Sequence, residues 1–186
     1  MQTASWLAPY MLFEVNDMSE TQEIKETTEV IPSRGDIARQ NFYDGYNCAQ
    51  SLFMAFSDLT GYTREEAARL SAPFGAGMGR MREVCGAMSS VLMVLGILRG
   101  YADTGEDGKK AALYAEVQEL FAAFSAKRGT FLCRELLGKT ESGPDAPTPD
   151  ARTAEYYASR PCAEIIADAA NLLESYLQET REKDNF

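Results

Sequence analysis

The segment from Glu83 to Leu98, EVCGAMSSVLMVLGIL, decides the fold. Its second half is apolar on nearly every side, which is typical of a buried helix rather than of a surface helix with one apolar face. We expect a helix from about Met81 or Glu83 to Leu98, and we expect it to be the central, most buried element of the protein. Cys85 lies close to its start.

Helical patterns continue on both sides of this segment, and N-cap residues mark several starts. No strand-like alternation competes with them. The fold class is therefore predicted to be all-α, a compact single-domain bundle of five to eight helices. The further helices are expected at Ser33 to about Asp44, Asn47 to about Leu59, Thr63 to Ser71, Lys109 to about Lys127, Thr130 to Leu137, near 151–158, and Ser159 to about Glu179.

The chain has 186 residues, of which 45% are hydrophobic, enough for one domain with a real core. We assign the helical four-cysteine domain to residues 32–180 and a short tail to 181–186. Residues 1–31 contain six acidic side chains and one lysine, half of the net charge of −10, and we expect this segment to be loose. The change in polarity at Met18 suggests that translation begins there.

The composition excludes several partners. No basic stripe runs along the chain, so nucleic acid is not an expected partner. No apolar run reaches the roughly 18–20 residues that a membrane span needs. No Lys or Arg precedes Lys25, whereas a secretory signal begins with a positive region, so we expect a cytoplasmic protein. The acidic, helical composition is compatible with a homo-oligomer, and the sequence identifies no redox partner.

Four cysteines carry the candidate chemistry: Cys48, Cys85, Cys133 and Cys162. Each lies near the start of an expected helix, and Asn47, Thr130 and Ser159 are good N-cap residues ahead of three of them. The unpaired N–H groups and the positive dipole end of a helix start favour thiolate over thiol. The thiolate is both the nucleophile and the metal ligand. We therefore take all four as candidate catalytic residues and candidate metal ligands.

Histidine is absent from the chain. This excludes Cys/His zinc fingers, Cys-His nucleophile pairs and His-ligated haem. No carboxylate pair stands out, so nothing supports a hydrolase. The cysteines also lack the paired C-x₂₋₄-C spacing of most zinc and iron–sulfur sites, and a shared site must be assembled by the tertiary fold, one ligand per helix start.

A glycine-rich segment precedes Cys85. Gly75, Gly77 and Gly79, followed by Arg80, are the candidate cofactor-binding residues of a loop that we expect to fold over the Cys85 region. The segment lacks the preceding strand and the spacing of nucleotide-binding fingerprints. Arg80 and Arg82 would place positive charge near a thiolate, although we expect at least one of them to be solvated.

Five parts of the chain carry a resemblance to a known family: NCAQS at 47–51, FGAGMGRM at 74–81, EVCGA at 83–87, CRELLG at 133–138, and Cys162. Together they resemble the C_GCAxxG_C_C family. The resemblance runs from about residue 35 to 178, with all four family cysteines matched in order. One position departs, because Ser90 stands where the family's CGAxxG element ends in glycine; the serine hydroxyl needs a partner.

The resemblance implies redox activity or metal–sulfur chemistry and names no substrate. A more distant likeness to the cysteine-bearing part of split-Soret cytochromes would favour an iron–sulfur centre. No haem is expected, because the chain has no C-x-x-C-H attachment sequence.

Three functions remain open. The first is a redox protein that uses the four cysteines for thiol–disulfide exchange, with Cys85 or Cys48 as the attacking thiol, or for electron transfer through an iron–sulfur centre. The second is a structural or buffering Cys₄ site for zinc or another soft metal. The third is a helical interaction module whose cysteines fill the core.

Overall fold

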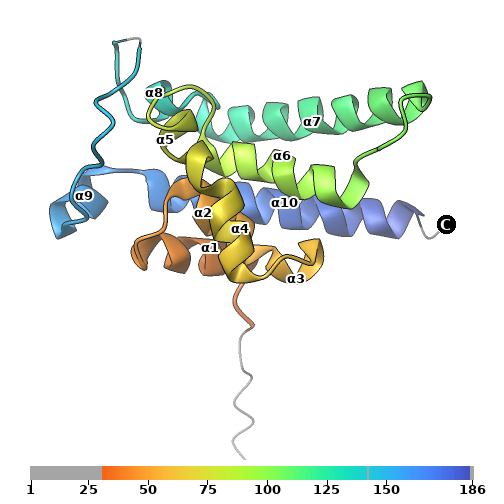
Figure 1. Ribbon diagram of the computed structural model, residues 1–186, viewed down its shortest axis with the longest axis horizontal. Coiled ribbons are helices and arrows are strands. Elements are labelled where there is room, and N and C mark those ends of the chain that lie inside the picture. The colour runs from red at the N-terminus through yellow and green to blue at the C-terminus, as the bar shows by residue number, and fades with distance from the viewer. Residues whose placement is uncertain (1–30, 142, 185–186) are drawn as a thin grey trace, which may run out of the picture. The chain divides into compact units, whose positions relative to one another are not determined.

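A computed structural model describes residues 31–141 and 143–184 (Figure 1). The predicted all-α class is confirmed: within these residues there is no strand, and the only β-type pairing is an isolated antiparallel bridge between Val84 and Leu132. The loose N-terminal segment and the start at Met18 lie outside the described residues.

Six helices of at least eight residues form the bundle in the described part of the chain, and shorter helical turns connect them. The six agree with the predicted five to eight. They are α1 (Arg34–Tyr43), α2 (Cys48–Ala55), α4 (Arg64–Ser71), α6 (Gly86–Arg99), α7 (Asp107–Arg128) and α10 (Cys162–Asp184). The short elements are α3 (Ser57–Thr60), the 3₁₀ turn η1 (Ala72–Phe74), α5 (Gly75–Met78), α8 (Cys133–Leu136) and α9 (Ala154–Ser159).

The centre of the bundle is α2 rather than α6. Six of the eight residues of α2 are buried, and this helix packs against α1, α4, α6 and α10. Most of α6 is buried as far as Leu95, but Ile97 and Leu98 near its end are exposed. The prediction that α6 is the most buried element is therefore wrong. Helix α2 is short enough for the neighbouring helices to cover it along its length, whereas the longer α6 extends beyond its neighbours.

Helix starts confirm part of the sequence prediction. Ser33, Asn47 and Thr63 each cap a helix, and each belongs to a capping box. Two predicted caps are wrong: Leu132 instead of Thr130 precedes α8, and Ser159 ends α9 instead of starting α10. Helix α10 also extends to Asp184, beyond the predicted end at about Glu179.

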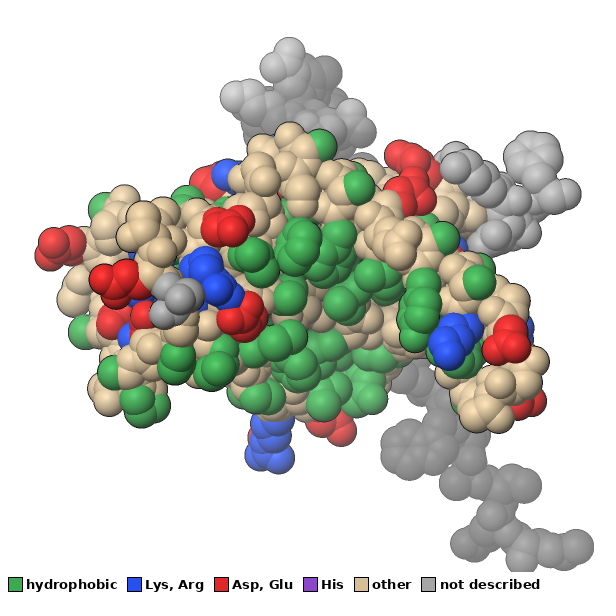
Figure 2. Space-filling model, turned by 90° about the horizontal axis from the view of Figure 1, so that it is seen from above, with side chains coloured by type: hydrophobic (Ala, Val, Ile, Leu, Met, Phe, Trp, Pro, Cys, Tyr) green, Lys and Arg blue, Asp and Glu red, His purple; other side chains and the backbone are tan. Residues whose placement is uncertain are grey.

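Helices α6, α7 and α10 lie side by side, with α7 outermost (Figure 1). Only Leu120 and Phe124 of α7 are buried. Viewed from above, this side of the molecule presents a broad area of hydrophobic side chains bordered by charged ones (Figure 2). No helix in the described part of the chain combines the length and apolarity needed to cross a membrane.

Candidate functional site

Each of the four cysteines lies at a helix N-terminus. Cys48, Cys133 and Cys162 are the first residues of α2, α8 and α10, and Cys85 directly precedes α6. The positions therefore agree with the sequence prediction, although these helices lie far apart along the chain. All four cysteines are free thiols.

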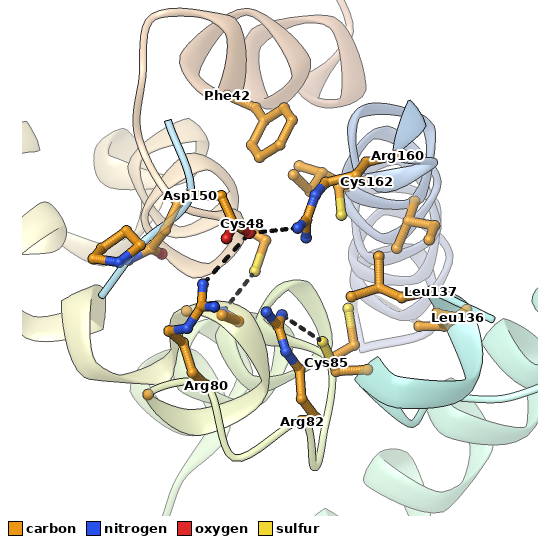
Figure 3. A pocket seen from close by; sticks show the side chains of 18 of the residues that line it. Phe42, Cys48, Arg80, Arg82, Cys85, Leu136, Leu137, Asp150, Arg160 and Cys162 are labelled. Atoms are coloured by element: carbon orange, nitrogen blue, oxygen red, sulfur yellow. Dashed lines mark hydrogen bonds and ion pairs between the residues drawn. The ribbon is translucent and has the colours of Figure 1, made fainter. Parts of the chain in front are cut away.

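The fold brings the four thiols to one cavity of about 270 Å³. Cys48 and Cys162 are partly exposed, whereas Cys85 and Cys133 are 5% and 7% exposed. Figure 3 shows Cys48 and Cys162 facing the same space as the guanidinium groups of nearby arginines. The apolar part of the lining includes Phe42, Leu136, Leu137, Pro147, Pro149, Ile165 and Ile166.

A short antiparallel pairing places Cys85 beside Cys133. The N–H of Cys85 donates to the carbonyl of Phe131 over 2.9 Å, and the N–H of Cys133 donates to the carbonyl of Glu83 over 2.6 Å. Because residues 83–85 take part in this pairing, α6 begins at Gly86 and not at the predicted Met81 or Glu83. The pairing joins two segments that are far apart in sequence.

The glycine-rich segment turns in a left-handed sense against the thiols. Ala76, Gly77, Met78, Gly79 and Arg80 all have φ between 55° and 71°. For a residue with a Cβ this conformation costs about 1–2 kcal/mol, and such residues occur singly more often than in runs. A strained run of this kind is characteristic of functional loops, where the surrounding contacts hold it in place.

Close contacts explain two of the glycines around the thiols. A Cβ at Gly77 would lie 2.6 Å from the Cβ of Cys133, and a Cβ at Gly86 would lie 2.5 Å from the sulfur of Cys48. The same turn aims the N–H of Ala76 at Cys48 Sγ, at 3.4 Å. The loop therefore packs on Cys48 and Cys133. It also contacts the chain on both sides of Cys85, since the N–H of Glu83 donates to the carbonyl of Gly77 over 3.2 Å and a Cβ at Gly86 would lie 2.8 Å from the carbonyl oxygen of Phe74.

Ser90, the departure from the family pattern, has the partner that its hydroxyl needs. Its Oγ donates to the carbonyl of Ala49 over 2.8 Å, and the side chain is fully buried. The bond ties α6 to the first turn of α2, next to Cys48. The serine therefore keeps the two helices close, although it is larger than glycine.

Arg80 and Arg82 both line the cavity. Their side chains are 15% and 3% exposed, so the expectation that at least one of them is solvated is wrong. Arg82 Nη1 lies 3.8 Å from Cys133 Sγ, and Arg82 Nη2 lies 2.6 Å from a carboxylate oxygen of Asp145. Arg80 lies 3.5 Å from Asp145 and 3.6 Å from Asp150.

Two further arginines line the cavity and were missed in the sequence analysis. Arg160, two residues before Cys162, pairs with Asp150 at 2.6 Å. Arg152 lies over the rings of Phe42 and Tyr156, at 4.8 and 4.9 Å from their centroids. The position of Arg160 next to a candidate cysteine was a usable signal, whereas Arg152 and the two aspartates lie in a proline-rich segment without a motif.

The environments of the thiols differ. Burial raises the pKa of Cys85 well above its usual range, and charge on Cys48 adds to this effect, while the N–H groups of Ala87 and Met88 oppose it. Burial also raises the pKa of Cys162 to about 12. Burial and charge on Cys48 raise the pKa of Cys133, and the Arg82 guanidinium opposes the rise.

The predicted cofactor-binding residues divide between two roles. Gly75, Gly79 and Arg80 line the cavity, while Gly77 packs behind it against Cys133. Within residues 31–141 and 143–184, no three His, Cys, Asp or Glu side chains are arranged to hold a metal ion. The thiols as arranged therefore do not fit a zinc ion or an iron–sulfur centre, and metal ligation by the four cysteines stays a prediction.

No curated protein and no solved structure matches the chain significantly. A family model does: the one described as "Putative redox-active protein (C_GCAxxG_C_C)" matches residues 46–176, most of the chain and all four cysteines. This confirms the resemblance inferred from the cysteine segments. The protein belongs to the C_GCAxxG_C_C family.

Proposed function

We propose that this protein is a thiol–disulfide redox protein in which Cys48 attacks a substrate disulfide and Cys133 resolves the mixed disulfide. The observation that carries the proposal is the convergence of four free thiols on one cavity. A dithiol of this kind works as a reductant in a reducing compartment, so we also propose a cytoplasmic location.

Two features of Cys48 support its role as the attacking thiol. Cys48 begins α2 and is partly exposed at the cavity. Its sulfur also accepts a hydrogen bond from the N–H of Ala76. Such surroundings are typical of nucleophilic cysteines. Cys85, the other candidate, is buried, and its pKa lies well above its usual range, which disfavours it as a nucleophile at neutral pH.

Charge on Cys48 raises the pKa of each of the other three thiols, so its sulfur lies within electrostatic range of all of them. Among the three possible resolving thiols, Cys133 alone accepts a hydrogen bond from a cationic side chain, that of Arg82, in the described part of the chain. A guanidinium beside a sulfur stabilises its thiolate. These contacts favour Cys133 as the second nucleophile.

The reaction balances without a further reactant. The thiolate of Cys48 attacks one sulfur of R–S–S–R; the S–S bond breaks, and the leaving RS⁻ takes up a proton from water. Cys133 gives its proton to water, and its thiolate attacks Cys48 Sγ to release the second RS⁻. Two protein thiols are thereby oxidised to one disulfide, and the substrate disulfide is reduced to two thiols.

The other functions have less support. A core of packed cysteines needs neither the buried Arg82 nor a left-handed run that includes Ala76, Met78 and Arg80. Each of these features has a cost in folding free energy that packing alone does not explain. A Cys₄ metal site would need a rearrangement that brings three or more of the sulfurs around one ion.

Thiol counting and disulfide mapping test the proposal. The reduced full-length protein is mixed with excess hydroxyethyl disulfide, quenched with iodoacetamide and analysed by peptide mass spectrometry. We expect loss of two thiols and a disulfide between Cys48 and Cys133. The reaction of Cys133→Ser should stop at the mixed disulfide on Cys48. Cys48→Ser should form neither that mixed disulfide nor the Cys48–Cys133 disulfide.

Cys85→Ala is the matched control, because it removes a thiol of the same cavity that has no assigned role. This variant should still form the Cys48–Cys133 disulfide. If Cys85→Ala blocks the disulfide and Cys133→Ser does not, the resolving thiol is wrongly assigned. If the folded protein loses thiols no faster than the urea-unfolded chain, the site gives no activation and the proposal fails.

A further inference from the structure

The charge around the thiols is opposite in sign to that of the whole chain. Among the residues that the structure describes, four arginines line the cavity, Arg80, Arg82, Arg152 and Arg160, and Asp150 is the one carboxylate in its lining. Asp145, which pairs with Arg82 and Arg80, is the second carboxylate at this cluster. Even with both carboxylates counted, two positive charges remain, on a chain whose net charge is −10.

Arg152 is the guanidinium that the aspartates leave uncompensated. In the part of the chain that the structure describes it makes no ion pair; it lies over the rings of Phe42 and Tyr156 and donates to the carbonyl of Tyr46 at 3.2 Å. Stacking fixes the plane of a guanidinium and leaves N–H donors at its edge available to a ligand. A guanidinium with free edge donors matches a carboxylate, which it can bind through two parallel hydrogen bonds.

The size and polarity of the cavity restrict what enters it. Its volume of about 270 Å³ suits a small molecule and not a folded protein domain. Phe42, Leu136 and Ile165 supply an apolar wall that suits short carbon chains. The occupant that fits both parts of the lining is small, with an apolar middle and anionic ends.

We propose that the substrate is a small disulfide that carries carboxylate groups, held by the Arg152 side of the cavity while Cys48 attacks its S–S bond. This inference rests on the thiol–disulfide function proposed above and names its substrate class. The arginines would also steer such an anion toward the cavity against the negative charge of the rest of the molecule, an effect that salt screens.

Three disulfides of similar length and different charge test this proposal: dithiodipropionate with two carboxylates, hydroxyethyl disulfide without charge, and cystamine with two ammonium groups. Thiol loss of the reduced full-length protein is followed by stopped flow. Each rate is divided by the rate of the same disulfide with dithiothreitol, which removes differences in intrinsic reactivity. We expect dithiodipropionate to exceed cystamine by at least about tenfold at low salt, with a smaller ratio at high salt.

Variants assign the preference to Arg152. Arg152→Gln should lower the ratio of dithiodipropionate to hydroxyethyl disulfide by about threefold or more, and Arg152→Lys, which keeps the charge, should retain most of it. Arg69→Gln is the control, because Arg69 is exposed and pairs only with Glu65 on its own helix α4 in the described structure. It should leave all three rates unchanged, and melting temperatures verify that each variant is folded.

The outcomes separate the two proposals. If none of the three disulfides oxidises the protein, the thiol–disulfide function itself fails. If all three react and the normalised rates are equal, or cystamine is fastest, the protein is a thiol redox protein but its substrate is not anionic. If the anionic preference is present and unchanged in Arg152→Gln, the substrate class holds and its assignment to Arg152 is overturned.

Discussion

Gly86 lies directly against the sulfur of Cys48. A Cβ at position 86 would stand 2.5 Å from Cys48 Sγ and 2.8 Å from the carbonyl oxygen of Phe74, closer than real Cβ contacts allow. The sulfur of Cys48, the first residue of α2, occupies the space that a side chain at Gly86, the first residue of α6, would need. This contact is what lets two helix N-termini meet at one cavity.

Gly86→Ala should displace Cys48 or shift α6. We expect a loss of about 1–3 kcal/mol in the free energy of unfolding, the usual cost of overpacking a buried site, and a change in the alkylation rate of Cys48. Urea unfolding and timed iodoacetamide labelling measure the two effects.

Gly96→Ala is the matched control within the same helix, because no described atom outside the neighbouring helix backbone lies within 4 Å of a Cβ built there. In the interior of α6, alanine should be neutral or should stabilise the protein by up to about 1 kcal/mol. Equal effects of the two substitutions would mean that the contact with Cys48 has no energetic weight.

Arg82 lowers the cost of a thiolate at Cys133. Its guanidinium opposes the rise in the pKa of Cys133 that burial causes. Arg82→Gln should therefore raise the pKa of Cys133 further, so that resolution of the mixed disulfide on Cys48 slows at neutral pH and its pH profile moves to higher pH. Arg82→Lys should restore part of the rate, since it keeps the charge without the planar fork.

The resolution rate of the mixed disulfide, measured from pH 6 to 10 with about one-unit steps, tests this expectation. Arg69→Gln again serves as an exposed control. A lower rate in Arg82→Gln with an unshifted pH profile would assign Arg82 a purely structural role, through its pair with Asp145.

Much of the local structure could be predicted from the sequence. Asn47 caps α2 as expected, because a capping side chain and the helix it starts are neighbours in the chain. The position of Cys48 follows from the same local signal. Cys133 and Cys162 also begin helices, but not through the caps predicted at Thr130 and Ser159. The convergence of the cysteines does not follow from local signals, because it depends on how α2, α6, α8 and α10 pack, and no sequence spacing encodes that.

The errors have two physical causes. The start of α6 was placed too early because residues 82–85 pair with a segment near Leu132, a contact between distant parts of the chain. At least one of Arg80 and Arg82 is expected to be solvated in the manner of most arginines, yet Asp145 pairs with both of them. Arg82 also donates to the buried Cys133. The left-handed run was invisible because Ala76, Met78 and Arg80 are not residues that normally adopt positive φ.

Asp145 gives the stability of the protein a dependence on acid. Its hydrogen bonds with Lys139 and Arg82 hold the pKa of this carboxyl at about 2, against 3.8 for a free aspartate. A carboxyl whose pKa is lowered by folding stabilises the protein above the unfolded value, and this contribution is lost as the pH falls from about 4 to 2. Asp145→Asn should therefore lose less stability than the parent as the pH falls from about 4 to 2.

Urea unfolding of the parent and the variant between pH 7 and about 2 measures the difference between their profiles. Asp103→Asn, on an exposed loop, controls for the loss of one carboxylate from the chain. Parallel profiles for the parent and Asp145→Asn would show that the carboxylate contributes no acid-dependent stability.

Cys162 should make the protein sensitive to alkali. Burial, with charge on Cys48 and Cys133, raises the pKa of this thiol to about 12, against 9.0 when it is free. Below pH 9 the thiol is neutral in both the folded and the unfolded chain, so its contribution to stability is fully present. Between about 9 and 12 the unfolded chain loses the proton first, and the free energy of unfolding falls as the pH rises.

Cys162→Ala should therefore lose stability less steeply above pH 9 than the parent, when both are kept reduced and unfolded with urea. The remaining slope comes from the other groups whose pKa burial raises, Cys85 and Cys133 among them. Ser159→Ala, three residues earlier, removes no titrating group and should keep the slope of the parent. If Cys162→Ala and the parent have the same slope, Cys162 ionises as readily in the folded protein as in the unfolded chain, and its burial at the cavity is relieved by water.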